Sequence, residues 1–525
     1  MKKANQSISN IILENMTDRV KIAYIGAGSF RFSTPFFNDM IVMSANHSMP
    51  LEIGLCDINH NSLNLMTKYL SKIIETNRKY ENDIKISASV NQRDVLENAD
   101  FVYKSISVGG QNAEWYDIYL PLKLGIPQNT GDTAGPGGIF RGLRVIPAVA
   151  KIIKDMKDLC PKAPLFNYTN PQSTIILAAR TISKDIQSIG LCHELFFGMR
   201  PILRYFKKYY GMNIKTWQEL DIKYAGINHF AWLTDILFSG EDLYNRLREN
   251  AHKFVLCNLN RPVGDYYGGF NFHLLERYNN YPYPGSRHIA EFLPNYFNYF
   301  NYEIQAPYWK FPRVRNVMAL SLMRKNVYQN IEGIINSKEI FKIRGPSNER
   351  SMDMLISFLS NIKSTHVINV PNSFQGGKII NQLPSDCIVE IPAYFLNKKI
   401  TPLDDIELPN HIADLLIPHC EQQRLTVDAA LGNDKELIYK AMLNDPMCKW
   451  IENEEMIRHL TDLMLFYEQE WLPEEWGELI LSEKDLRNSK FWVSKLDLSS
   501  ENKKCIKKKY SPNPELESKA FFWKD

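Results

Sequence analysis

The sequence predicts an α/β protein whose first 200 residues or so form a doubly wound parallel sheet, followed by an α+β second domain. Short apolar runs rich in β-formers alternate with helical periodicity over about 180 residues, and this alternation stops near residue 200. The unusual polar motifs follow the apolar runs directly. Because ligands bind at the carboxyl ends of parallel strands, these motifs mark the expected ligand site.

The predicted elements follow one another as strand and helix. The first strand is expected at residues 20–25, and a helix follows near residues 35–45. The later strands are expected in LEIGLCD, IKISASV, ADFVYKSISVGG, APLFNYTNP and QSIGLCHE, and the helices in SLNLMTKYLSKIIETNR, GLRVIPAVAKIIKDMKDLC and STIILAARTIS. Beyond residue 200, loops rich in Tyr, Asn and Pro such as YNNYPYPGSRH interrupt the pattern, and from residue 485 the chain is polar and lysine-rich.

Composition and charge exclude several classes of protein. The 525 residues are 44% hydrophobic and 23% charged, which is typical of a globular chain, and this length predicts two domains or one large unit with an elaborated second half. Lys and Arg number 62 against 59 Asp and Glu, and the net charge of +3 argues against nucleic-acid or membrane partners. The eight cysteines form no CxxC pair and no run approaches 18 apolar residues, so we expect a reduced, cytoplasmic protein.

A glycine pair between the first strand and its helix predicts a dinucleotide site. In GAGSFR, Gly26 and Gly28 allow the backbone to approach a pyrophosphate, although Arg31 replaces the third glycine of GxGxxG. Asp57 ends the next strand, where a carboxylate accepts the ribose hydroxyls and favours NAD over NADP. The expected cofactor contacts are Gly26, Gly28, Ser29, Asp57 and Gly109.

Cysteine and histidine side chains follow two further apolar runs. Cys192 and His193 follow SIGL, and Asn228 and His229 follow the run in YAGINHFAWL. One thiolate and one imidazole from different strands would leave a divalent cation with open positions, which suits the chelation of substrate oxygens. On spacing alone, the simpler explanation is a buried thiol and a core histidine without an ion.

The motifs GAGS, VGG, NYTNPQ, GLCHE, INHFAWL and GSRHIAEFLP occur in this order, followed by NQLPSDCIVEIPAYF and AALGNDKELIYKAMLNDP. This order resembles glycoside hydrolase family 4, the NAD- and metal-dependent glycosidases. We therefore expect a Rossmann-type dinucleotide-binding domain at 18–200, an α+β substrate, catalytic and oligomerisation domain at 201–484 packed over the active-site cleft, and a lysine-rich C-terminal extension at 485–525. The resemblance also implies NAD, Mn²⁺ or another divalent cation, a small-molecule glycoside as the ligand, and a homodimer or homotetramer.

The resemblance implies a particular mechanism and particular ligands. In that family the sugar is oxidised at C3, the glycosidic oxygen leaves by elimination between C1 and C2, water adds and the sugar is reduced again, so no carboxylate pair is required. Cys192 and His229 match the residues that bind the ion, and Asn170 matches an asparagine that contacts sugar hydroxyls.

The predicted substrate is an α-glucuronide or α-galacturonide. The sequence Cys-His-Glu-Leu differs in one conservative step from the Cys-His-Glu-Val of the family members that resemble α-glucuronidases and α-galacturonidases. Arg287 in GSRH could bind the C6 carboxylate of a hexuronic acid, or could equally be a structural residue paired with Glu291.

The serine of GSRH departs from the pattern of the family. Related enzymes carry an aspartate, the suspected C2 base, where Ser286 stands, and a serine hydroxyl cannot do that work unaided near neutral pH. Tyr281 or Tyr283 could replace it, or could simply pack in a Tyr/Pro loop, while His193 or Glu194 could protonate the leaving oxygen. The catalytic candidates are His193, Tyr281, Tyr283 and Ser286, and the substrate-binding candidates are Asn170, Glu194, Asn228, Arg287 and His288.

The loss of that aspartate keeps two alternatives open. An NAD-dependent sugar dehydrogenase would need the nucleotide and metal sites but no C2 base. A catalytically silent protein could bind NAD and a sugar without turning either over.

Overall fold

The computed structural model describes residues 19–47, 49–77, 84–258, 267–296, 317–338, 351–374, 376–403, 406–449 and 451–493. One mixed sheet of 13 strands runs through this part of the chain in the order β10-β8-β7-β12-β11-β6-β5-β4-β1-β2-β3. Two short strands lie off this path, β9 (Glu241–Asp242) beside β8 and β13 (Lys399–Pro402) beside β12. The predicted α/β class is confirmed.

The first half of the chain forms the parallel part of the sheet. Its order β3-β2-β1-β4-β5-β6 is that of a Rossmann-type dinucleotide fold, and every pair within it is parallel. The strands are β1 (Val20–Ile25), β2 (Leu51–Cys56), β3 (Ile84–Ser89), β4 (Phe101–Lys104), β5 (Leu165–Asn167) and β6 (Ser188–Gly190). The carboxyl ends of these strands form one edge, to which the predicted polar motifs belong.

Several predicted boundaries in this half are wrong, and two of them show the cause. The helix expected near residues 35–45 is α2 (Phe30–His47), which begins at the end of the glycine turn and contains Pro35. The strand expected over QSIGLCHE ends at Gly190, and Glu194 already belongs to the next helix. Side-chain hydrophobicity alone does not place these ends, because apolar residues occur on both sides of each turn.

The second half extends the same sheet with antiparallel strands. β11 (Ser364–Pro371) pairs with β6 through Asn369 and Gly190, and thereby joins the two halves. The remaining strands are β7 (Asp221–Ile227), β8 (Phe230–Phe238), β10 (Tyr281–Pro282) and β12 (Ile388–Leu396). This continuity joins strands that are more than 170 residues apart in the chain, so local sequence patterns do not reveal it.

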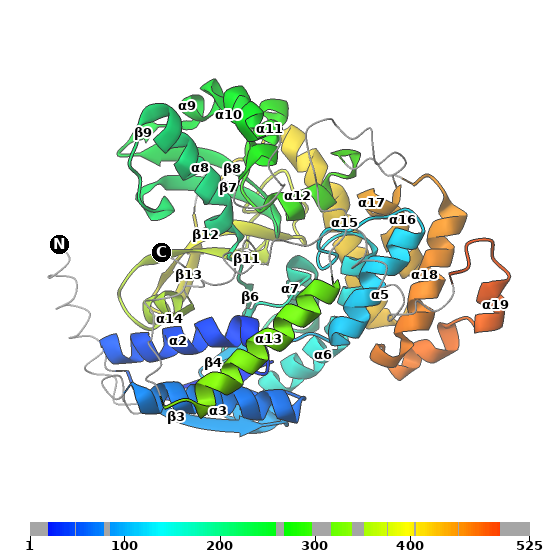
Figure 1. Cartoon of the computed structure of the whole chain (residues 1–525), viewed down its shortest axis with the longest axis horizontal. Helices are drawn as coiled ribbons and strands as arrows, with labels where there is room; N and C mark the ends of the chain where they lie inside the picture. The colour runs from blue at the N-terminus through cyan, green and yellow to red at the C-terminus, as the bar shows by residue number, and fades with distance from the viewer. Residues whose placement is uncertain are drawn as a thin grey trace.

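Helices cover both faces of the sheet (Figure 1). Alternate residues of β1 separate into two hydrophobic clusters, with Ile22 and Tyr24 in one and Ala23 and Ile25 in the other, as the two-residue period of a strand requires. The longer helices of the first half are α2, α3 (His60–Thr76), α5 (Gly110–Lys123), α6 (Gly135–Leu159), α7 (Gln172–Ile182) and α8 (Glu194–Tyr210). The others are α4 (Gln92–Leu96), α9 (Tyr244–Glu249), α10 (Ala251–Asn258), α11 (Gly269–Tyr278), α12 (Ser286–Phe292), α13 (Val317–Asn336), α14 (Ser351–Leu359), α15 (Asn410–Gly432), α16 (Lys435–Asn444), α17 (Pro446–Lys449), α18 (Glu454–Glu468) and α19 (Glu483–Arg487).

Within the described residues, no helix has the length and apolar character needed to cross a membrane. Of the C-terminal extension predicted at 485–525, residues 494–525 lie outside the described part of the chain.

Candidate active site

The turn between β1 and α2 has the backbone geometry that a dinucleotide-binding turn requires. Gly26 has φ +93°, and a Cβ there would lie 2.2 Å from the carbonyl oxygen of Ser105. A Cβ on Gly28 would lie 2.7 Å from Oδ2 of Asp57. Both positions therefore exclude a side chain, and α2 begins directly after them at Phe30, so that a helix N-terminus follows the glycine pair as in a dinucleotide-binding turn.

The predicted ribose ligand lies against this turn. Gly28 N–H donates to Asp57 Oδ2 at 2.9 Å, while Asn59 N–H donates to Oδ1 at 2.8 Å. Ser29 N–H closes the turn by donating to the Gly26 carbonyl. Gly109, with φ +78°, caps α5 after β4. The five predicted cofactor contacts thus lie on the turns after β1, β2 and β4, at one edge of the sheet.

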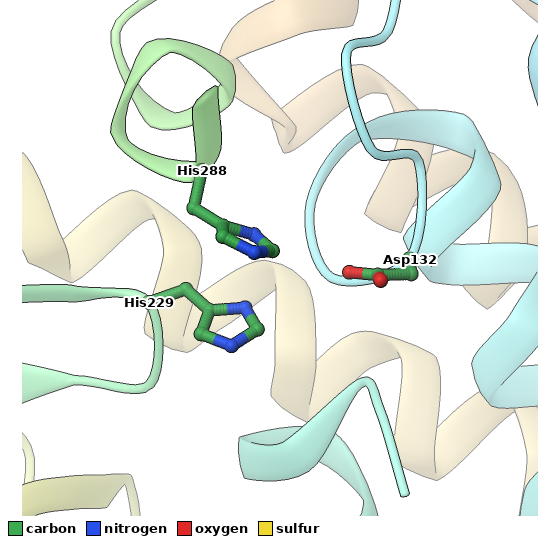
Figure 2. A group of neighbouring side chains, drawn as sticks. All are labelled: Asp132, His229 and His288. Atoms are coloured by element: carbon green, nitrogen blue, oxygen red, sulfur yellow. The ribbon is translucent and has the colours of Figure 1, made fainter. Parts of the chain in front are cut away.

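Three side chains from distant parts of the sequence converge beside this edge. Asp132, His229 and His288 each offer a ligand atom, and these atoms lie within 4.8 Å of one another. Figure 2 shows the two imidazoles one above the other, with the carboxylate of Asp132 facing them from the loop before α6. The ring centroids of His229 and His288 are 3.9 Å apart. Two imidazoles and a carboxylate form a suitable ligand set for a divalent transition metal.

The turn between β7 and β8 holds His229 in place. This residue has φ +65°, an uncommon conformation outside glycine, and its side chain is buried. Thr133 Oγ1 donates to Asp132 Oδ1 at 2.7 Å and lies 3.0 Å from His229 Nδ1. If the hydroxyl proton points to Asp132, its oxygen accepts from Nδ1–H, and Nε2 then has the free lone pair that a metal needs.

Electrostatics also favours a neutral, ligating imidazole at His229. Burial, the largest effect, lowers its pKa to about 4, and Asp132 opposes this change. The positive charges of His193 and Arg31 lower the pKa further. Arg31 lies two residues after Ser29 of the glycine turn. The cluster therefore lies within electrostatic reach of the predicted nucleotide turn.

Cys192 belongs to an adjoining polar group rather than to this cluster of three. Its thiol hydrogen-bonds the side chains of Glu390 and Asn228. Burial, followed by the charges of Glu390 and Glu194, raises the pKa of the thiol. Because Asn228 precedes His229 in the same turn, the two groups adjoin. The joint binding of one ion by Cys192 and His229 stays a prediction.

Glu390, on β12, is the centre of this second group. It is fully buried and accepts hydrogen bonds from Asn228 Nδ2 at 2.8 Å and Asn369 Nδ2 at 2.9 Å, and a short one from the Tyr283 hydroxyl. Burial raises its pKa, while these donors oppose the change. The carboxylate thus ties β7, β11, β12 and the chain after β10 together directly behind Cys192.

The candidate bases are all engaged in hydrogen bonds. Tyr281, also buried, donates to the Gly198 carbonyl at 3.3 Å. Burial raises the pKa of both Tyr281 and Tyr283, and the charge of Glu390 raises that of Tyr283 further. Ser286 is buried and donates to Asn271 Oδ1 at 2.6 Å. In this arrangement the hydroxyl of Ser286 and both phenols act as hydrogen-bond donors.

Glu194 connects the start of α8 to the start of α12. Its Oε2 accepts from Gly285 N–H at 2.8 Å, and its Oε1 lies 3.7 Å from His288 Nε2 and 4.0 Å from His193 Nε2. The side chain of His193 is 20% exposed, so it can reach a ligand in the site. Glu194 therefore lies between two of the predicted site histidines, at ion-pair rather than hydrogen-bond distance.

Glu291 holds the loop that carries Asp132. Its carboxylate accepts from the N–H groups of Thr130 and Gly131 at 2.6 and 2.9 Å, and from Thr130 Oγ1 at 2.9 Å. Burial raises the pKa of Glu291 to about 7. The carboxylate predicted as a possible partner of Arg287 is thus bound to the Thr130–Gly131 backbone, and the side chain of Arg287 is exposed.

Asn170, the predicted sugar contact, lies at the end of β5. Its peptide bond to Pro171 is cis, and its carbonyl accepts from Arg141 Nε at 3.1 Å. Sequence reasoning missed Asp132 and Glu390. The glycine-rich NTGDTAG before a long helix and the single charge within the apolar run IVEIP are the signals that could have indicated them.

Fold and site together define an α/β protein with a dinucleotide-type glycine turn beside a cluster of metal-ligating side chains. The chain matches the family described as Family 4 glycosyl hydrolase over residues 21–207, and the C-terminal domain of that family over residues 224–448. This protein is therefore an enzyme of glycosyl hydrolase family 4, and the likeness seen in its motifs is confirmed.

Several proteins resemble it over most of its length. The α-galactosidase of Bacillus subtilis is 31% identical over 467 residues, which cover 86% of this chain and 99% of that protein. The α-galacturonidase of Thermoanaerobacter italicus is 29% identical over 443 residues, which cover 82% of this chain and 92% of that protein.

Solved structures share the fold. That of the lplD protein of Bacillus subtilis matches with a TM-score of 0.76 at 28% identity, covering 85% of this chain and 100% of that one. A 6-phospho-α-glucosidase from gut microorganisms, solved in complex with NAD and Mn²⁺, matches with a TM-score of 0.71 at 18% identity. The match covers 87% of this chain and 100% of that one.

Proposed function

We propose that this enzyme is an NAD- and divalent-metal-dependent α-glycosidase that hydrolyses α-glucuronides or α-galacturonides. One observation carries the proposal: Asp132, His229 and His288 bring three ligand atoms within 4.8 Å of one another, in a chain whose turn after β1 has the glycine geometry of a dinucleotide site. A sugar chelated by a cation at this cluster would be the partner of a dinucleotide bound at that turn. Family membership supports the same chemistry.

The residues fit both cofactors. Gly26, Gly28, Ser29, Asp57 and Gly109 would hold NAD, and Asp132, His229 and His288, joined by Cys192, would hold Mn²⁺ or another divalent cation. When bound, the two cofactors supply reversible hydride transfer and polarisation of the sugar oxygens.

The chain's own side chains perform the remaining tasks. His193, partly exposed beside Glu194, would protonate the leaving glycosidic oxygen. Asn170 and Asn228 would orient the sugar ring beside the cluster that holds His288, and the exposed Arg287 would bind a C6 carboxylate. In this proposal Ser286, which donates to Asn271, would shape the site, and Tyr283 with its partner Glu390 would serve as the acid–base pair.

The second part of the proposal is the identity of the sugar that the enzyme cleaves. Similarity to α-galacturonidases and the Cys-His-Glu-Leu motif favour a uronic acid. Similarity to the Bacillus subtilis α-galactosidase makes an α-galactoside the second candidate. We also expect a cytoplasmic homodimer or homotetramer, which light scattering on the purified chain would test.

The test uses the purified enzyme with NAD⁺, Mn²⁺ and a reductant. It receives p-nitrophenyl α-glucuronide, α-galacturonide or α-galactoside while nitrophenol and NADH are followed together. Nitrophenol without net NADH is the expected result with a uronide. Stoichiometric NADH from the free sugar would instead identify a dehydrogenase, and NAD binding without either product would identify a silent binding protein.

A further inference from the structure

A cavity of about 350 Å³ lies between helices α8 and α10, two of the helices that Figure 1 shows gathered at one side of the molecule with α9 and α11. This volume falls within the roughly 300–1,000 Å³ of small-molecule sites. None of its described lining residues belongs to the glycine turns, to the metal cluster or to the candidate substrate contacts. The cavity is therefore a second place at which a ligand could bind.

One wall of this cavity is positively charged. Arg204, Lys207 and Lys208 lie three and four residues apart on α8, so they extend from one face of the helix, where like charges repel one another. The described lining contains no carboxylate, and Lys207 forms no ion pair with any residue that the structure describes. The negative end of the helix dipole attracts the two lysines of the last turn, but Arg204 lies a turn earlier. An anion in the cavity would neutralise this wall.

The other side of the cavity is aromatic. Phe254 of α10 is buried, and Tyr267 lies just before α11. The guanidinium carbon of Arg204 lies 5.7 Å from the centroid of the Tyr267 ring, so cation and ring adjoin. Lys208 Nζ lies 3.2 Å from Cys257 Sγ, which brings the charged wall of α8 to α10. A ligand held by the cations would therefore also contact aromatic surface.

We propose that this cavity binds a small phosphate monoester that carries an aromatic or apolar group. The phosphate would accept hydrogen bonds from the guanidinium of Arg204 and the ammonium groups of the two lysines, while the organic group would pack on Phe254 and Tyr267. A phosphate monoester carries a charge of about −1.5 to −2 near neutral pH, so three cations favour it over a carboxylate.

The occupant would be an additional ligand of the enzyme and not its glycoside. Helix α8 begins at Glu194 in the candidate active site, whereas the cations of the cavity lie in the second half of the helix. The inference thus goes beyond the proposed function and does not rest on it. A phosphate bound here would leave the glycine turn and the metal cluster open to their own ligands.

The first experiment titrates phenyl phosphate into the full chain by calorimetry, with saturating NAD⁺ to occupy the glycine turn and EDTA to keep metal ions from the phosphate. Wild type should bind one molecule per chain, and benzoate should bind at least about ten-fold more weakly. R204Q and K207Q should each weaken the binding of phenyl phosphate by about five-fold or more.

The matched control is K253Q, which removes the same charge from an exposed position of α10 outside the cavity, where Lys253 donates to Asn250 Oδ1 at 3.0 Å. It should bind phenyl phosphate as wild type does. Because Lys207 is exposed, K207Q tests the site even if R204Q fails to fold. Three results would each overturn the inference: no binding to wild type at millimolar phenyl phosphate, equal losses in K207Q and K253Q, or benzoate bound as tightly as phenyl phosphate.

A second readout locates the bound molecule. Cys257 is exposed and lines the cavity, so phenyl phosphate should slow its alkylation by iodoacetamide, followed by mass spectrometry of the modified peptide. In K207Q the same protection should need about five-fold more phenyl phosphate. An unchanged rate at Cys257 when the calorimetric site is full would place the phosphate elsewhere and contradict the inference. Neither readout depends on glycosidase activity, so a failure here leaves the proposed function standing.

Discussion

The imidazole rings of His229 and His288 lie with their centroids 3.9 Å apart, although 58 residues separate them in the sequence. One ring comes from the turn between β7 and β8, and the other from the first turn of α12. Two buried or partly buried imidazoles this close would repel each other if both were protonated, so the arrangement disfavours a pair of imidazolium rings.

Replacing either ring is expected to remove metal binding. In H229A and H288A the affinity for Mn²⁺ should fall by about 100-fold or more, because a ligand is lost from a set of three or four. Electron paramagnetic resonance of free Mn²⁺ in a titration measures this directly. H252A is the control, since that imidazole is exposed and pairs with Glu276 outside the site. Retention of wild-type affinity in H229A would contradict the assignment.

Cys192 is expected to become a metal ligand only when a bound cation displaces the proton of its thiol. C192S should bind Mn²⁺ about ten-fold more weakly and lose more affinity for Cd²⁺, because a thiolate prefers the softer ion. Calorimetry with the two ions gives the comparison, and C257S, at an exposed position, is the matched control. Equal losses for both ions would place the thiol outside the ligand set.

Glu390 is expected to be essential to stability. In E390Q the new amide nitrogen would face donors from Asn228, Asn369 or Tyr283, so at least one buried group loses its partner. The free energy of unfolding should fall by about 2–4 kcal/mol, as chemical denaturation would show. The exposed E475Q should unfold like wild type. A variant as stable as wild type would show that the network is dispensable.

The stability of the fold should depend on pH through Asp445. Its buried carboxylate accepts from Gly135 N–H at 3.0 Å and from Met447 N–H at 2.9 Å, and burial raises its pKa from 3.8 to about 6. A raised pKa means that the folded state holds the proton more tightly. The contribution to stability is therefore fully present below pH 3.8 and is lost as the pH rises through about 6.

The variant D445N isolates this effect. The free energy of unfolding of wild type relative to D445N should decrease by about 3 kcal/mol between pH 4 and pH 7, with most of the change below pH 6. Denaturation series at several pH values measure the difference. A constant difference across this range would contradict the raised pKa.

The sequence predicts those features that depend on residues close together in the chain. The strand at residues 20–25 and the glycine turn after it depend on neighbouring residues only, and the strand lies where it was predicted. Asp132 was not predicted as a metal ligand because this role depends on contact with residues about 100 and 150 positions away. The pairing of β11 with β6 was hidden for the same reason, since a strand's own residues fix its period but not its partner.

The site shows the same division. His229 stood out because an Asn-His pair after an apolar run is unusual, whereas the link from Glu390 to Tyr283 and Cys192 exists only once three strands meet. The hydrogen bond from Ser286 to Asn271 likewise required the packing of α12 against α11. Local composition identifies candidate groups, and tertiary contacts decide which of them share a function.

The oxidation and elimination route is tested most directly by the fate of the hydrogen at C2. The enzyme would hydrolyse p-nitrophenyl α-galacturonide and α-glucuronide in D₂O with NAD⁺ and Mn²⁺, and the released sugar would be analysed by NMR. We predict deuterium at C2 and no product when NAD⁺ is omitted. A product that keeps hydrogen at C2, or that forms equally well without NAD⁺, would contradict the account.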